Sequence, residues 1–167
     1  RFMAIESLNE ECGLFGIYNP NETVAESIYI GLFALQHRGQ ESAGIATSNN
    51  NKFFSKTDTG LIANVFNDFD VNKLEGGIGI GHTRYSTTGT HSKENAQPVI
   101  VNGINGEIAL GHNGNIVNAE ELKDKYLSEY DIEYKATADS EVIAYMYANS
   151  VGNNWFERSN YCMRYIK

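Results

Sequence analysis

The chain has 167 residues, of which 41% are hydrophobic and 20% charged, and its formal net charge is −8. This length suits one domain with a buried core and is too short for two large domains. The acidic balance argues against nucleic acid and anionic membranes as partners, because both attract basic patches. The sequence has no apolar run of membrane-spanning length and no signal-peptide stretch in residues 1–11, so the expected compartment is the reducing cytoplasm.

The first third of the chain predicts a strand followed by a helix. Residues 12–18 form a short apolar run that the turn-forming residues 19–21 terminate. A helix should follow, with Asn21 as its cap and with its end at Arg38-Gly39. Its apolar stripe at helical spacing comprises Val24, Ile28, Leu32 and Leu35.

The middle of the chain predicts a hairpin and a glycine-rich strand. Residues 43–48 and 52–56 read as two strands around the Asn49–Asn51 turn. Glycines then alternate with isoleucine from Gly76 to Gly81, which suggests a strand that another backbone approaches closely.

The last third predicts a second hairpin and three helical segments. Strands are expected at 98–102 and 107–112, with Asn105-Gly106 as the turn. Asn118 and Glu121 resemble a capping box for a helix that ends at Tyr130, and a further helix should open at Asp139. The final amphipathic segment, which we interpret as core, carries Trp155, Cys162, Met163 and Ile166. Blocks of strands and helices predict an α+β layered domain.

Cys12 lies at the start of the first apolar run. If cleavage made it residue one, its free α-amine would have a reference pKa of roughly 7.7–8.0 beside a thiol of roughly 8.5. Nucleophile and proton acceptor would then lie on one residue, as in amino-terminal threonine enzymes. The alternative is a buried cysteine packed as a small hydrophobe. Cys162, 150 residues away, is interpreted as packing, with no metal or disulfide spacing between the two.

Polar clusters next to predicted strands supply groups suited to thiol attack on the side-chain amide of an amino acid. Asn113 and the Gly114 N–H could form an oxyanion hole. Arg84 suits a carboxylate, and Asp139 suits an ammonium group. Each has a plainer alternative, since Asn113-Gly114 could be only a turn, Arg84 a surface ion pair and Asp139 a helix cap. The clusters span residues 36–44, 81–89, 112–115 and 138–141.

The four histidines do not predict a metal site. No pair has the spacing of a helical zinc motif, and the chain has no phosphate-binding loop of a known type. We therefore expect no metal and no nucleotide cradle in this chain. These histidines are His37, His82, His91 and His112.

Several motifs together resemble the class II glutamine amidotransferases, which are amino-terminal-nucleophile hydrolases. They are Cys-Gly-x-Phe-Gly-Ile at 12–17, Leu-Gln-His-Arg-Gly-Gln-Glu-Ser-Ala-Gly at 35–44, Gly-His-Thr-Arg-Tyr-Ser-Thr-x-Gly at 81–89, Ala-Gln-Pro at 96–98, His-Asn-Gly-Asn at 112–115 and Ser-Glu after Asp139. Within this class they are most similar to the amidophosphoribosyltransferase family. Glucosamine-6-phosphate synthase fits less well, since its expected Tyr-Arg-Gly-Tyr-Asp and Arg-Trp-Ala-Thr motifs are replaced.

The resemblance implies a fold and a set of catalytic residues. The fold would be a four-layer αββα sandwich, incomplete at the carboxyl terminus. Cys12 would be the nucleophile, released by cleavage of the Glu11–Cys12 bond, with its new α-amine as general base. Asn113 and Gly114 would stabilise the oxyanion.

The resemblance also assigns the substrate contacts. Arg84 and Thr87 would hold the α-carboxylate of glutamine, and Asp139 its α-ammonium. The Arg38-Gly39 loop would line the site near the nucleophile.

The same resemblance divides the chain into a leader at residues 1–11 and a partial amidotransferase domain at 12–167. A phosphoribosyltransferase domain, absent here, would use the ammonia on phosphoribosyl pyrophosphate in the first committed step of purine synthesis. Magnesium and an iron–sulfur cluster are expected only in that missing part, and the parent protein should be a homo-oligomer. The alternative function is an unprocessed, inactive fragment or a glutamine-binding module.

Overall fold

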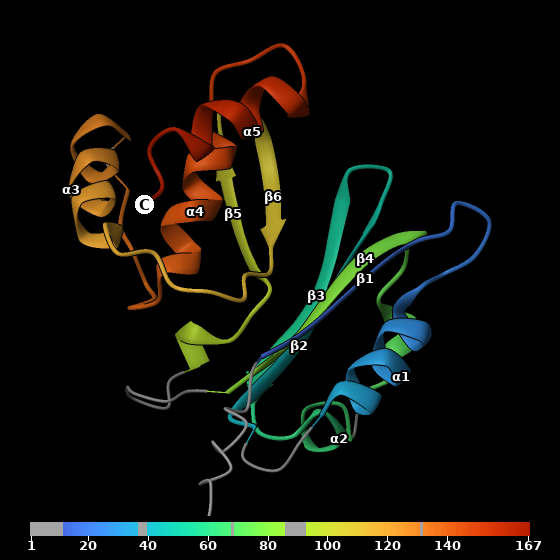
Figure 1. The fold of residues 1–167 in the computed structure, drawn as a ribbon. Helices are drawn as coiled ribbons and strands as arrows, with labels where there is room; N and C mark the ends of the chain where they lie inside the picture. Colours follow the sequence, from blue (N-terminus) through green and yellow to red (C-terminus); the bar gives the residue numbers. More distant parts are fainter. Residues whose placement is uncertain (1–11, 37–39, 68, 86–92, 131) are drawn as a thin grey trace, which may run out of the picture.

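The computed structural model describes residues 12–36, 40–67, 69–85, 93–130 and 132–167. Helices, a first sheet, a second sheet and further helices follow one another as layers (Figure 1). The predicted α+β class and the αββα order of layers are therefore confirmed. In the described residues the second sheet has two strands.

The first sheet is antiparallel, with the strand order β1-β4-β2-β3. Helices α1 and α2 pack against its outer face (Figure 1), and the 3₁₀ turn η1 packs against α1. The elements are β1 (Gly13–Tyr18), α1 (Ala25–Leu35), β2 (Ser42–Asn49), β3 (Lys52–Thr59), α2 (Ile62–Val65), η1 (Val71–Lys73) and β4 (Ile78–Arg84).

The second half of the chain forms a hairpin with helices packed against it. Helix α4 contacts both strands of this hairpin, and α3 and α5 pack against α4. The elements are η2 (Lys93–Asn95), β5 (Val99–Gly103), β6 (Gly106–Leu110), α3 (Ala119–Tyr130), α4 (Asp139–Ala148) and α5 (Trp155–Met163).

The core of the first half lies between α1 and the sheet. Ile28 and Leu32 are fully buried there and project onto β4. A Cβ on Gly79 would lie 2.7 Å from Ile28 Cδ1, and one on Gly81 would collide with Ile28 Cγ2. The alternating glycines of β4 thus admit helix side chains as well as backbone, which corrects the expectation of a close backbone alone. Leu35, the last member of the predicted stripe, is 38% exposed.

The second core lies among α3, α4 and α5. Cys162 is fully buried within it, which confirms its interpretation as a packing residue. Trp155 and Met163 are 52% and 62% exposed, so their assignment to the core is wrong. Within α5 the buried residue is Cys162, whereas the Trp155 ring, at the start of the helix, has the Arg158 guanidinium carbon 4.9 Å from its centroid.

The predicted start and end of the first helix differ from the structure. Helix α1 begins at Ala25 with Val24 at the cap position. Asn21 instead donates its N–H to Asn19 Oδ1 at 3.2 Å, in a local turn before the helix. The predicted helix end at Arg38-Gly39 lies outside the described residues, and α1 ends at Leu35.

Asn118 precedes α3 as predicted, but its side chain binds the carboxyl-terminal segment. Its Nδ2 donates to the Tyr165 carbonyl at 2.8 Å, and its Oδ1 accepts from the Lys167 N–H at 3.0 Å. The amide therefore joins two distant segments, which corrects the expectation that it pairs locally with Glu121.

The two hairpins follow the expected turn chemistry closely. Asn50 and Asn51 have φ values of 48° and 64°, as a two-residue turn between right-twisted strands requires. In the second hairpin Gly103 pairs with Gly106, so the turn is Ile104-Asn105, one residue earlier than predicted.

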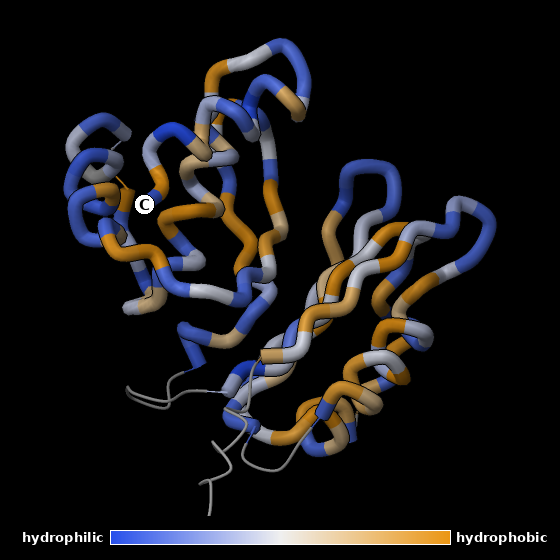
Figure 2. Tube along the Cα trace, in the orientation of Figure 1, coloured by the Kyte–Doolittle hydropathy of each residue, from blue (hydrophilic) through white to orange (hydrophobic). Residues whose placement is uncertain are grey.

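Hydropathy follows this architecture. Apolar stretches run along the sheet strands and along α1, whereas the tip of the β2–β3 hairpin is hydrophilic (Figure 2). Among the described residues, no helix combines the length and the apolar character needed to cross a bilayer.

Candidate active site

Cys12 lies immediately before β1, beside the end of β4. Gly13 pairs with Thr83 in the ladder and also donates its N–H to Thr83 Oγ1 at 3.1 Å. The Cys12 Sγ accepts from the Tyr85 N–H at 3.4 Å and lies 3.6 Å from the Tyr85 carbonyl oxygen. The thiol is half-buried and unpaired with the other cysteine. The sheet therefore presents an accessible thiol at its end.

Arg84 is the last residue of β4 and extends from the same end of the sheet. Its Nη1 lies 3.5 Å from Glu41 Oε2, and the two side chains are only 18% and 11% exposed. The ion pair allowed by the simpler alternative is therefore present, but both of its side chains are largely buried. The guanidinium carries five donors, and it also lines the cavity beside Cys12.

The segment 112–116 follows β6 and closes over Cys12. Asn113 Nδ2 donates to the Cys12 carbonyl at 3.0 Å, so the amide reaches the residue that carries the thiol. The His112 ring lies beside Gly114, since a Cβ on that glycine would be 2.8 Å from His112 Nε2. Asn113-Gly114 is thus more than an exposed turn, because it contacts the residue 101 positions away.

Asp139 is the first residue of α4, and its carboxylate faces the segment 112–116. Its Oδ2 accepts from the Ile116 N–H at 2.9 Å, and its Oδ1 lies 3.4 Å from His112 Nδ1. The cap position belongs to Ala138, with no side-chain cap bond, so the helix-cap alternative is wrong. Burial raises the pKa of Asp139, but hydrogen bonds from His112 and Ile116 outweigh it, and the pKa lies below 3.8. The group is an anion at neutral pH.

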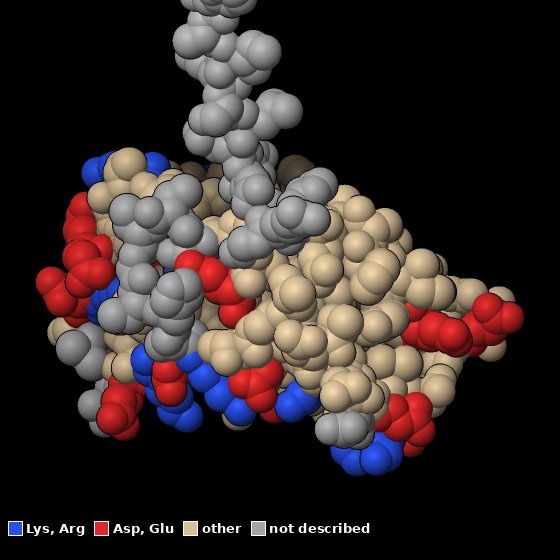
Figure 3. Space-filling view, turned by 90° about the horizontal axis from the view of Figure 1, so that it is seen from below, with Lys and Arg blue, Asp and Glu red and all other residues tan. Residues whose placement is uncertain are grey.

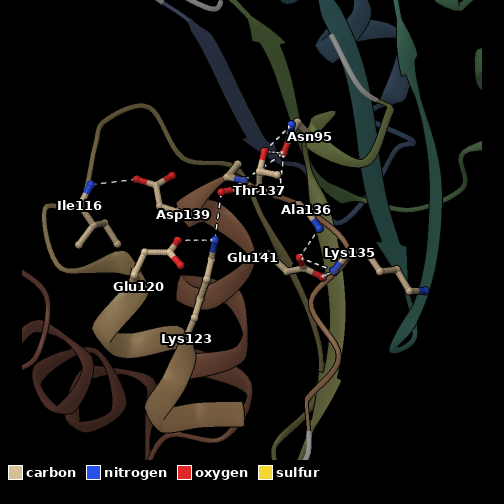
Figure 4. A network of polar contacts seen from close by, with 10 residues as sticks. Asn95, Ile116, Glu120, Lys123, Lys135, Ala136, Thr137, Asp139 and Glu141 are labelled. Carbon is tan, nitrogen blue, oxygen red and sulfur yellow. Dashed lines mark hydrogen bonds and ion pairs between the residues drawn. The ribbon is translucent and has the colours of Figure 1, made fainter. Parts of the chain in front are cut away.

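A polar network fixes the backbone that precedes Asp139 (Figure 4). The Oδ1 of buried Asn95 accepts from the N–H groups of Thr137 and Ala138 at 3.1 and 3.0 Å. Glu141, only 6% exposed, accepts from the N–H groups of Lys135 and Ala136. Glu141 of the Ser-Glu pair after Asp139 thus has a structural function, which the sequence did not indicate.

These side chains surround one cavity of about 570 Å³. Predicted residues that line it are Cys12, Arg84, Asn113, Gly114 and Asp139. Further lining residues, to which sequence reasoning gave no role, include Tyr85, Gln97 and Ser140, which lie within the quoted motifs. Ile116 and Thr137 also line the cavity and lie outside those motifs. The predicted residues Arg38, Gly39 and Thr87 lie outside the described part of the chain.

The cavity combines a thiol, an amide donor, a guanidinium and a carboxylate. The last two are complementary to the α-carboxylate and α-ammonium of a free amino acid. Within the described residues, no three His, Cys, Asp or Glu side chains are grouped so that they could hold a metal ion. On the face shown in Figure 3, Lys and Arg side chains are interspersed with Asp and Glu, without a basic patch.

Comparison with known proteins defines the class first. The pattern of the glutamine amidotransferase domain family matches residues 63–162, more than half of the chain. The chain therefore belongs to the glutamine amidotransferase domain family.

The individual relatives carry a more specific name. The chain is 47% identical over 150 residues to the amidophosphoribosyltransferase of Synechocystis sp., which covers 89% of this chain and 30% of that protein. It is 49% identical over 134 residues to the enzyme of the same name from Methanocaldococcus jannaschii, covering 80% of this chain and 28% of that protein. The chain thus spans about 30% of the length of these relatives.

A solved structure supports the same relationship. Glutamine phosphoribosylpyrophosphate amidotransferase from B. subtilis, complexed with ADP and GMP, superposes with a TM-score of 0.79 at 35% identity. The superposition covers 92% of this chain and 33% of that one.

Proposed function

We propose that this domain hydrolyses glutamine to glutamate and ammonia through the thiol of Cys12. The observation that carries the proposal is the contact of Asn113 Nδ2 with the Cys12 carbonyl at 3.0 Å, in a cavity that also contains Arg84 and Asp139. Membership of the glutamine amidotransferase domain family supports glutamine as the substrate.

In the proposed reaction the Cys12 sulfur attacks the side-chain carbonyl carbon of glutamine. The oxyanion that forms accepts hydrogen bonds from Asn113 Nδ2 and the Gly114 N–H. The tetrahedral intermediate collapses with loss of ammonia and leaves a thioester. Water then cleaves the thioester, which releases glutamate and restores the thiol.

The proton acceptor is the α-amine of Cys12, set free by cleavage of the Glu11–Cys12 bond. It takes the thiol proton and delivers a proton to the departing nitrogen. In the uncleaved chain this nitrogen is an amide, which is not basic, so attack lacks a proton acceptor. Residues 1–11 are accordingly proposed to be a leader that is removed.

The remaining groups orient the substrate. Arg84, together with Thr87, binds the α-carboxylate, and Asp139 binds the α-ammonium. Arg38 and Gly39 line the site near the nucleophile. Because the Asp139 carboxylate is ionised at neutral pH, it can pair with the ammonium group without first losing a proton.

The similarity to amidophosphoribosyltransferases supports a wider proposal for the protein to which this domain belongs. The ammonia is transferred to phosphoribosyl pyrophosphate by a further domain, in cytoplasmic purine synthesis. That domain would supply the magnesium site and, in members with such a leader, an iron–sulfur cluster. The protein is proposed to be a homo-oligomer.

The test is an intact-mass measurement before and after exposure to a glutamine-like diazoketone, which alkylates a reactive thiol with loss of N₂. We expect a mass that begins at Cys12 and one adduct on that residue. Glutamate release from glutamine, measured in parallel, should disappear with the adduct.

Cys162 provides the internal control. It is fully buried, and burial raises the pKa of its thiol to about 11, so it should stay unmodified. A Cys162→Ala variant should label as the wild type does, whereas Cys12→Ala should not label. A full-length mass without adduct would support the alternative of an unprocessed, inactive glutamine-binding module.

A further inference from the structure

The two peptide groups that flank the His112 α-carbon are each held by a buried side chain. Gln97 Oε1 accepts from the His112 N–H at 2.7 Å, and His82 Nε2 lies 3.1 Å from the His112 carbonyl oxygen. Gln97 is 5% exposed and His82 is fully buried. The next two residues along the chain are Asn113 and Gly114, so these contacts fix the start of the proposed oxyanion hole.

We infer that His82 and Gln97 are positioning residues for the Asn113 and Gly114 donors. This inference rests on the proposed hydrolysis of glutamine. Neither side chain needs to touch the substrate, because each acts on the backbone that carries the donors. A displacement of about 1 Å in such a donor can cost roughly 100-fold in rate.

The contact of His82 Nε2 with the His112 carbonyl also defines which nitrogen of the His82 ring carries the proton. A carbonyl oxygen only accepts, so Nε2 carries the proton. Nδ1 is buried and has no hydrogen-bond partner among the described residues, which suits a bare ring nitrogen. Burial, and then the charges of Arg84 and His112, lower the pKa of His82 to about 4, against the carbonyl bond, which raises it. At neutral pH the ring is therefore a neutral donor with a defined tautomer.

His82 and Gln97 are both held in place by the first sheet. His82 is on β4, paired with Leu14 of β1 on one side and Gly44 of β2 on the other. Gly44 has no side chain, and a Cβ there would collide with the Gln97 carbonyl. The backbone of Gln97 thus lies directly against the sheet, and its side chain is aimed from there at the His112 N–H. The Ala-Gln-Pro motif at 96–98 acquires a function in this way.

The test measures glutamate release by the protein expressed from its complete gene. His82→Ala and Gln97→Ala should each lower kcat about 10- to 100-fold, with the KM for glutamine changed less than about threefold. His82→Gln, whose Nε2 can still donate, and Gln97→Glu, whose Oε1 can still accept, should recover most of the loss. Recovery by these variants separates a positioning role from general destabilisation.

Thr47→Val is the matched control. Thr47 is 1% exposed, and its hydroxyl donates to the Glu75 carbonyl at 2.8 Å, at the other end of β2. It should lower the melting temperature while leaving kcat unchanged. An active wild type whose kcat is unchanged in the folded His82→Ala and Gln97→Ala variants would overturn the inference. Conservative variants that lose as much turnover as the Ala variants would also overturn it. A wild type that releases no glutamate would instead overturn the proposed function.

Discussion

The two walls of the cavity are held in place by different kinds of contact. On one side, Cys12 and Arg84 lie at the ends of β1 and β4, which pair along their whole length from Gly13–Thr83 to Tyr18–Ile78. On the other side, the segment 112–116 lies beyond the end of β6. Its backbone is bound by the side chains of Gln97, His82 and Asp139.

This difference predicts different responses to substitution. A ladder distributes its constraint over many backbone bonds, so one lost contact leaves the others in place. A segment held by single side chains loses a backbone partner with each substitution. Changes in the contacts that hold segment 112–116 should therefore reduce turnover, whereas changes in the contacts that hold the strands carrying Cys12 and Arg84 should mainly reduce stability.

The largest effect is expected for Asn113→Ala. Removal of one oxyanion donor typically costs 10²–10³ in kcat, about 2.7–4 kcal/mol, whereas glutamine binding is retained. Steady-state kinetics of glutamate release should show this loss at a nearly constant KM. Asn118→Ala removes another amide that binds backbone, at Tyr165 and Lys167, and should leave kcat unaltered. An unchanged kcat in Asn113→Ala would remove this residue from the mechanism.

The next effect concerns the contribution of His82 to the stability of the folded protein in acid. The pKa of His82 is lowered from 6.5 to about 4, so below pH 6.5 the unfolded chain binds a proton that the folded one resists. The contribution of neutral His82 to the free energy of unfolding is present above pH 6.5 and is lost as the pH falls towards 4. This loss amounts to at most about 3 kcal/mol. The pKa of Asp139 is lowered below 3.8, so this residue loses its contribution to the free energy of unfolding only as the pH falls below 3.8.

Urea unfolding at several pH values between 4 and 7 measures this loss. The wild type should lose stability more steeply than His82→Gln, which cannot take up the proton. Parallel curves for the two proteins would show that His82 is not the group responsible for the loss of stability in acid.

The sequence predicted the sheet wall and the residues of the site better than it predicted their support. The Asn49–Asn51 turn and its strands were recognisable because positive φ and alternating patterns are local properties. Cys12, Asn113 and Asp139 were identifiable through the resemblance. The partners of Gln97 and Glu141 were not, because spacing along the chain does not reveal which distant backbone group a buried side chain will meet. The capping assignment of Asn118 failed for the same reason, since its side chain binds the distant backbone of Tyr165 and Lys167. The assignment of Asn21 failed because α1 begins at Ala25, with Val24 at the cap position.

A smaller effect on binding is expected for Asp139→Asn. The change removes the anion proposed to bind the substrate ammonium and weakens a charge-assisted bond worth roughly 1.5–3 kcal/mol, so the KM for glutamine should rise roughly 10- to 100-fold. Glu141→Gln is the matched control, since Glu141 is another buried acid of α4 that binds backbone N–H groups outside the proposed contacts. It should lower the melting temperature without raising KM. Equal KM values for Asp139→Asn and the wild type would exclude Asp139 as the ammonium ligand.

The smallest effect on turnover is expected on the sheet wall, for Thr83→Val. Thr83 is fully buried, and its hydroxyl accepts from the Gly13 N–H at 3.1 Å, next to Cys12. Loss of this acceptor should cost about 1–3 kcal/mol in the free energy of unfolding, measured in urea. Turnover should stay within about threefold of the wild type, because the ladder of β1 and β4 still holds the strand. A fall in kcat as large as that of Asn113→Ala would mean that the position of Cys12 also depends on a single side-chain contact, and the contrast between the two walls would not hold.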